Sequence, residues 1–126
     1  MCARFQFKGL SVHLQKGALI AVPNRTGGKI HGRFAGYMRK EKWEWWKPRT
    51  KAIHVVPVLS FGERDRRGQI HDFAVPAGKA AIMAEVEAYD GRPGLVVATQ
   101  AATGNVAQIH YRMPVIVDET FQPKFK

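Results

Sequence analysis

Short apolar runs broken by turn residues constrain the fold of this chain most strongly. Runs of this kind, bounded by Gly, Pro, Asn, Asp or Ser, predict β-strands. Asp90-Gly91 lies between two such runs and indicates a hairpin, although Arg92, Pro93 and Gly94 lengthen its loop beyond a two-residue turn. The predicted strands are residues 4–8, 12–14, 18–22, 53–59, 70–75, 81–89, 95–99 and 112–117.

Two segments combine strand and helix signals. Residues 80–89 contain Ala, Met and Glu, which favour a helix, but Ile82, Ala84, Val86 and Ala88 alternate as in a strand. We predict a strand there. Residues 36–49 are rich in Lys and Glu and end near Pro48, so they form the best helix candidate.

Length and composition predict one globular domain. The chain has 126 residues, of which 45% are hydrophobic, enough for a core but too few residues for two domains. We therefore expect a single mixed α+β, mostly β, domain over residues 1–126, with a loose basic tail over about 119–126.

The charge of the chain predicts an anionic partner. Lys and Arg number 20 against 10 Asp and Glu, a formal net charge of +10, which is typical of proteins that neutralise phosphates. Nucleic acid is the leading partner, and charge that only keeps the protein soluble, or that serves a ribosomal protein, is the alternative. We expect no membrane association, because there is no amphipathic basic helix and no apolar run near 20 residues long.

Cysteine and histidine usage predicts a cytoplasmic protein without a metal or cofactor. One cysteine cannot form an internal disulfide, and no basic segment followed by an apolar one opens the sequence. The five histidines are scattered, so none forms a zinc-binding pair with a neighbour.

Cys2 is the only cysteine, and removal of Met1 would make it the N-terminal residue. It would then carry a thiol and an α-amine on one carbon, a pair that condenses with aldehydes to a thiazolidine. A free α-amine titrates at about 7.7 to 8 and a free thiol near about 8.5, so this chemistry is accessible near neutral pH. The alternative is a small residue in a frayed terminus that merely permits Met1 removal.

Motifs at opposite ends of the chain resemble one known family. The start MCARF is similar to the Met-Cys-Gly-Arg-Phe/Tyr start of the SOS-response-associated peptidase (SRAP) family, and IHYRMPVIV at 109–117 resembles its Ile-His-x-Arg-Met-Pro-Val-Ile-Leu signature. TQAATGN at 99–105 resembles the stretch before that signature. VPVLSFGE at 56–63 can be laid on the family's Val-Pro-Ala-Asp-Gly-Phe-Tyr-Glu-Trp segment, which makes Glu63 the candidate active-site glutamate, ahead of Glu44.

The region before residue 53 resembles the family only in fragments. LIAVP at 19–23 is similar to a Leu-Ile-Pro element, and HGR at 31–33 lies where the family has Asn-Ala-Arg-x-Glu. Arg33 is retained, while His31 replaces the DNA-contacting asparagine and Ala35 replaces the glutamate. The chain also lacks the family's N-terminal helix and its Asn-x-Ala-Pro-Thr segment, and therefore resembles a shortened, divergent member.

The resemblance implies a fold, a partner and a reaction. It implies a barrel-like core of mixed and antiparallel sheets with few short helices, and a monomer that binds single-stranded DNA containing abasic sites in a bacterial or phage-infected cell. Cys2 would form a thiazolidine with the ring-opened abasic aldehyde, with Glu63 and His110 as proton-transfer groups. Autoproteolytic Met1 removal and weak lyase cleavage would use the same residues. The DNA-binding candidates are Arg4, Arg33, Arg112, His31 and, for base stacking, Trp43 or Trp46.

Other interpretations remain open at this stage. His110 could be a core histidine, and Glu63, followed by Arg64, Asp65, Arg66 and Arg67, could belong to a solvated charged turn. The main alternative function is a non-catalytic module for single-stranded nucleic acid that has lost the crosslinking chemistry. A cysteine hydrolase acting on small amides is a third hypothesis, which the positive charge disfavours.

Overall fold

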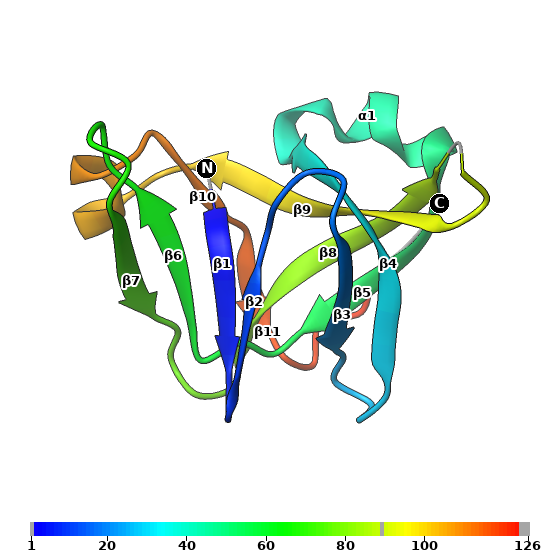
Figure 1. Cartoon of the computed structure of the whole chain (residues 1–126), viewed down its shortest axis with the longest axis horizontal. Coiled ribbons are helices and arrows are strands. Elements are labelled where there is room, and N and C mark those ends of the chain that lie inside the picture. Colours follow the sequence, from blue (N-terminus) through cyan, green and yellow to red (C-terminus); the bar gives the residue numbers. More distant parts are fainter. Residues whose placement is uncertain (1, 89, 124–126) are drawn as a thin grey trace.

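The computed structural model describes residues 2–88 and 90–123. The described chain is mostly β, with helical turns confined to short segments (Figure 1). The strands are β1 (Cys2–Phe7), β2 (Leu10–His13), β3 (Leu19–Pro23), β4 (Lys29–Arg39), β5 (Thr50–Val56), β6 (Ser60–Arg64), β7 (Ile70–Ala74), β8 (Lys79–Glu87), β9 (Pro93–Ala101), β10 (Arg112–Pro114) and β11 (Ile116–Asp118). The helical elements are α1 (Trp43–Trp46) and the 3-10 turns η1 (Lys40–Lys42), η2 (Lys47–Arg49) and η3 (Gly104–Gln108).

The strands form two sheets. The smaller sheet is antiparallel, in the order β2-β1-β6-β7. The larger sheet has seven strands: β11-β8-β9-β4-β3 form its main path, β5 also pairs with β8 and β10 also pairs with β9. Only β4 and β9 are parallel among the described pairs. The prediction of a barrel-like core was wrong, because the sheets do not close on themselves and end in edge strands such as β7 and β3.

The main core lies between the two sheets. Phe5 and Phe61 of the smaller sheet belong to the same buried cluster as Phe34, Met83 and Leu95 of the larger one. A second cluster lies on the other face of the larger sheet, around Met38, Ile82, Val86 and Val96. Trp43 and Trp46 pack on this second cluster, so the helical segment 40–49 covers it.

Double-sided burial explains the ambiguous segment. β8 pairs with β5, β9 and β11 and is buried along most of its length, which favours apolar residues on both of its faces. The strand prediction for residues 81–89 is confirmed through Glu87, while Tyr89 lies outside the described residues. The hairpin prediction is also confirmed, because β8 and β9 are antiparallel neighbours joined across Gly91.

The helix predicted for residues 36–49 was partly wrong. β4 continues through Arg39, and only residues 40–49 are helical, in three short pieces. Pairing of β4 with β9 extends to Arg39 and overrides the local helix propensity. The predicted strand 112–117 is two strands, since Arg112–Pro114 pairs with β9 and Ile116–Asp118 with β8. In the predicted tail, residues 119–123 carry no regular element, and residues 124–126 lie outside the described residues.

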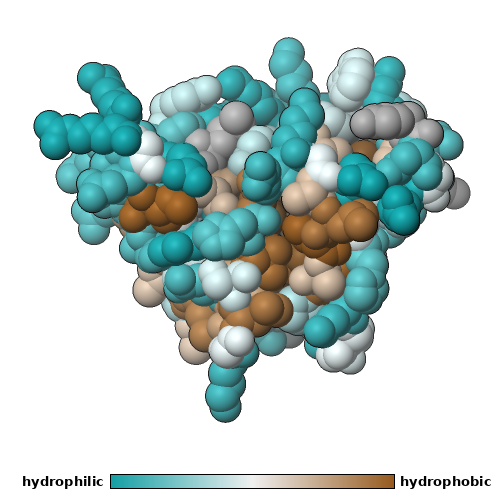
Figure 2. Space-filling view, in the orientation of Figure 1, coloured by the Kyte–Doolittle hydropathy of each residue, from teal (hydrophilic) through white to brown (hydrophobic). Residues whose placement is uncertain are grey.

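The surface carries polar side chains around small apolar areas. In Figure 2, hydrophilic residues surround and separate the hydrophobic patches on the face shown. Within the described residues, the search for a helix long and apolar enough to span a bilayer finds none.

Candidate functional site

A β-bulge at the start of β1 turns Cys2 toward the interior. Arg4 pairs with Gly62, and Cys2 pairs with Glu63, so β1 has one residue more than β6 between these pairs. In a regular strand Cys2 and Arg4 would share a face. The extra residue instead places Cys2 on the face of Phe5, in the buried core. Cys2 and Glu63 are consequently opposite each other on the inner face, and both side chains are 0% exposed.

Burial sets the protonation state of the thiol. The Cys2 Sγ donates to the backbone oxygen of Arg4, 3.5 Å away. Burial raises the pKa of the thiol well above its ordinary value, and the negative charge of Glu63 raises it further. Cys2 therefore holds its proton at neutral pH, and its use as a nucleophile requires a base.

Glu63 has the properties of that base. Burial raises the pKa of its carboxyl from the ordinary 4.5 to about 7. A carboxyl with this pKa exchanges protons near neutral pH and suits acid-base catalysis. Glu44, the other candidate, is an exposed residue of α1 outside the β1–β6 pairing, so the structure favours Glu63.

His110 lies between η3 and β10 and lines a pocket together with Ala3 and Arg64, the chain neighbours of Cys2 and Glu63. Its Nδ1 accepts the backbone N–H of Arg112 at 3.1 Å, so the neutral ring carries its proton on Nε2. Burial lowers the pKa of the imidazole. The neutral ring is therefore favoured at pH 7, with its proton on Nε2.

Tyr37 joins the larger sheet to this site. Its hydroxyl donates a hydrogen bond to the backbone oxygen of Cys2. Burial raises the pKa of the phenol well above its ordinary value, so the group stays protonated and keeps donating. Tyr37 thereby anchors the start of β1 against β4.

A pocket of about 730 Å³ opens beside these residues. Its lining includes Ala3 and Arg64, the chain neighbours of Cys2 and Glu63, together with Tyr37 and His110. The pair of Cys2 and Glu63 therefore lies next to a pocket whose lining includes their chain neighbours and His110.

Two further pockets adjoin the first. One, of about 420 Å³, shares Arg64, Asp65 and His110 with it. The other, of about 500 Å³, shares Leu14, Lys16 and Tyr37. We call the three together the trough.

Positive side chains line the trough from end to end. Arg64 and Arg66 lie at one end, Lys16 near the middle, and Arg39 and Arg112 at the other. Asp65 is the one acidic lining residue among those described. It is engaged with His71 at 2.7 Å and with the backbone N–H groups of residues 67 and 69. The trough therefore suits an extended anion.

Arg112 forms hydrogen bonds that hold His110 and the segment 40–49 together. Its guanidinium contacts Glu41 through two hydrogen bonds of 2.6 and 3.0 Å and Thr99 at 3.1 Å, and its side chain is only 6% exposed. Because its backbone N–H also holds His110, this residue connects the segment 40–49 to the imidazole. The resemblance assigned Arg112 to phosphate contact, but most of its hydrogen-bonding capacity is used within the protein.

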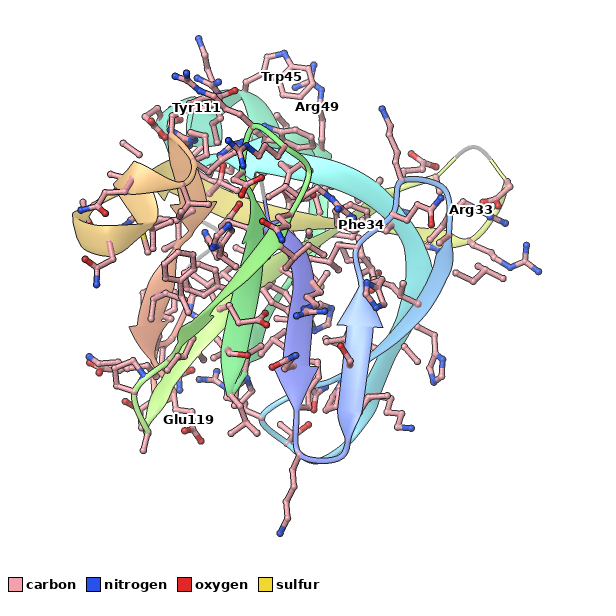
Figure 3. All side chains as sticks on the ribbon, turned by 60° about the vertical axis from the view of Figure 1, so that its left-hand side comes forward. Arg33, Phe34, Trp45, Arg49, Tyr111 and Glu119 are labelled. Atoms are coloured by element: carbon pink, nitrogen blue, oxygen red, sulfur yellow. The ribbon has the colours of Figure 1, made fainter. Side chains whose placement is uncertain are left out.

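The other DNA-binding candidates lie outside the trough. Arg4 pairs with Asp72 on the outer face of the smaller sheet. Arg33 pairs with Asp90 at 2.7 Å and also donates to Gly17 O. Figure 3 places Arg33 and Tyr111 on different sides of the molecule. His31 is exposed on β4 and lines a separate pocket of about 430 Å³.

The exposed tryptophan is not one of the two that were predicted to stack on DNA bases. Trp43 and Trp46, the two stacking candidates, are half-buried against the second core cluster. Trp45 is 54% exposed, with the Arg49 guanidinium 3.7 Å above its ring. Trp45, Arg49 and Tyr111 lie toward the same end of the molecule in Figure 3.

Sequence reasoning missed several residues of the site. Tyr111 lay within the motif at 109–117, and its position beside His110 was a usable signal. Lys16 and Tyr37 lie far in the sequence from Glu63 and His110 and line the pocket only because distant strands pair, which no local pattern shows. Arg66 lies in the charged turn after Glu63, where no local pattern indicates that it lines a pocket. Within the described residues, no group of three or more His, Cys, Asp or Glu side chains could hold a metal ion.

Comparison with models of protein families, with curated protein sequences and with solved structures finds no match for this chain.

Proposed function

We propose that this protein is an SRAP-like domain that captures abasic sites in single-stranded DNA through a covalent bond to Cys2. One observation carries the proposal: Cys2 lies opposite Glu63, and His110 lines the pocket beside them. Aldehyde capture by an aminothiol requires a thiol, a base and an acid at one place, and these three residues supply them.

The reaction begins with loss of Met1, which frees the α-amine of Cys2. Cys2 is fully buried, so capture also requires the thiol to become accessible. Either a cellular aminopeptidase or the site itself, with Cys2 as nucleophile and Glu63 or His110 as base, removes the methionine by hydrolysis.

The abasic sugar is mainly a closed hemiacetal and must open before capture. The Nε2–H of neutral His110 donates to the ring oxygen as the C1′–O bond breaks, and the hemiacetal hydroxyl loses its proton, which yields the aldehyde. The Cys2 amine then adds to C1′, and loss of water leaves an imine.

Ring closure completes the capture. Glu63 accepts the thiol proton, Sγ bonds to the imine carbon, and the nitrogen takes up a proton, giving a five-membered thiazolidine. No oxidant or reductant is needed. If closure is slow, the imine instead permits β-elimination and strand cleavage, which gives weak lyase activity.

The trough supplies the binding part of the proposal. A single strand carries one phosphate per nucleotide, and Lys16, Arg39, Arg64 and Arg66 offer charges along a continuous path past the Cys2 end of β1. A metal or small-molecule cofactor has no part in the proposed reaction.

The decisive experiment is intact-mass measurement of the des-Met1 protein mixed with a single-stranded oligonucleotide that carries one abasic site. We expect a heat-stable adduct with the mass of protein plus DNA minus one water. Undamaged DNA, the Cys2→Ala variant and protein that retains Met1 should give none. Glu63→Gln should slow adduct formation while DNA binding persists.

The alternatives give different results. DNA binding by des-Met1 protein without any adduct would contradict the covalent mechanism and leave a non-catalytic binding module. Absence of both binding and adduct would contradict the DNA proposal as a whole.

A further inference from the structure

Tyr111 presents an aromatic face at one end of the trough. Its ring stacks on His110 with centroids 4.7 Å apart and an interplanar angle of 22°. The side chain is nevertheless 64% exposed, the highest value among the large hydrophobic residues of the described chain that are exposed. One face of the ring therefore lies against His110, and much of the rest faces solvent.

The surroundings of Tyr111 suit a nucleotide. Tyr111 lines the pocket of about 420 Å³ together with Arg64 and Arg66. Arg64 donates one N–H to Gly68 O, which holds the side chain in the β6–β7 hairpin while other N–H groups remain for a ligand. An aromatic face beside two guanidinium groups is the arrangement that binds a base and its phosphate together.

The position of Tyr111 indicates that it would contact the nucleotide next to the abasic site. His110 lines both this pocket and the larger pocket beside Cys2, so the two pockets meet at the imidazole. A strand whose abasic sugar lies at Cys2 and His110 would place its next nucleotide in the adjoining pocket.

We propose that Tyr111 is a stacking platform for the nucleobase adjacent to the abasic site, with Arg64 and Arg66 contacting the phosphate of that nucleotide. This inference rests on the proposed function, since it takes the abasic sugar to lie beside Cys2. It adds a requirement to the substrate: one neighbour of the lesion must carry a base. Two adjacent abasic sites would then bind more weakly than one.

The test measures DNA binding with strands that cannot form the covalent bond. Tetrahydrofuran analogues of the abasic site have no aldehyde and cannot crosslink, so affinity for them is independent of the covalent step. Des-Met1 protein is titrated with strands that carry one analogue flanked by 2-aminopurine on its 5′ or its 3′ side, and fluorescence reports both binding and stacking.

We expect quenching of 2-aminopurine on one side of the lesion and a roughly tenfold loss of affinity in Tyr111→Leu, with little change in Tyr111→Phe, which keeps the ring. Trp45→Leu is the matched control, because it removes another exposed aromatic side chain that lies outside the trough lining. Unfolding midpoints of all variants verify that they fold.

A second comparison isolates the stacking term. Replacing the quenched neighbour by a second tetrahydrofuran should weaken binding to the wild-type protein and leave binding to Tyr111→Leu unchanged, because the two changes remove the same contact. Equal affinity of wild type and Tyr111→Leu, or additive losses, would overturn the inference.

Failure of this inference differs from failure of the proposed function. If Tyr111 does not stack, des-Met1 protein still forms the adduct with a true abasic site. If the covalent mechanism fails, quenching and the tandem-lesion effect remain measurable.

Discussion

The two ends of the β1–β6 pairing use the same inner face in different ways. At one end Phe5 lies opposite Phe61, and both side chains are buried in the main core. At the other end Cys2 lies opposite Glu63, and both are buried just as completely. The inner face of one ladder therefore carries an apolar pair at Phe5 and Phe61 and a thiol and a carboxyl at Cys2 and Glu63.

The difference teaches where stability and chemistry lie in this domain. Burial of an aromatic pair stabilises the fold, whereas burial of a carboxyl costs free energy and shifts its pKa. A residue with a strongly shifted pKa beside a pocket is a candidate for function. The apolar end is expected to hold the polar end in place.

The largest expected effect tests the apolar end. Phe61→Ala should lower the free energy of unfolding by about 3–5 kcal/mol, because it removes a buried ring that also stacks on Phe73. Urea denaturation measures the change. A loss below about 1 kcal/mol would show that this end is not the stabilising one.

Burial of the Glu63 carboxyl at the polar end should make the free energy of unfolding depend on pH. The Glu63 carboxyl releases its proton near pH 4.5 in the unfolded chain but near pH 7 in the folded one. Between these values the folded chain binds more protons, so rising pH favours unfolding. The free energy of unfolding should fall by about 3 kcal/mol across this window.

The Glu63→Gln variant separates this effect from other titrations. His110, whose pKa is lowered, acts in the opposite direction over part of the same range. Urea denaturation of wild type and variant at pH 5 and pH 8 should therefore give a difference that favours the variant more at pH 8. The same difference at both pH values would contradict the raised pKa.

The smallest expected effect concerns the support of the polar end. Glu41→Gln weakens the contact with Arg112, whose backbone N–H holds His110, and should lower the rate of adduct formation more than DNA affinity. It should also shift the pH profile of that rate. Glu44→Gln is the matched control, since it removes the same charge from the same segment without touching Arg112.

An equal loss in Glu41→Gln and Glu44→Gln would mean that charge alone matters. Adduct formation is measured under single-turnover conditions, with binding measured separately on undamaged single strands.

Much of the fold could be predicted because its signals are local. Turn residues mark the β8–β9 hairpin, and alternating apolar residues mark β8 despite their helix propensity. β4 could not be predicted in the same way. Its HGR segment lies in a strand that pairs in parallel with β9 across a long stretch of chain, a contact that no short window contains.

The residues of the candidate site also differ in how far local sequence predicts them. Cys2, Glu63 and His110 could be named from motifs, and the structure places Cys2 and Glu63 in register and His110 in the lining of the adjacent pocket. The roles of the arginines could not be predicted in this way, because a motif specifies a residue type but not the residue with which it pairs. Arg4 and Arg33 are held by Asp72 and Asp90, contacts between residues distant in the sequence.

The bulge at Ala3 decides which face of β1 carries the Cys2 thiol. Without the bulge, regular pairing of the same sequence would set Ala3 opposite Glu63 and turn the thiol to the outer face, the side on which Arg4 meets Asp72. Deleting Ala3 would instead remove the extra residue and leave Cys2 opposite Glu63 in regular register, so the thiol depends on the bulge only because the chain carries that residue.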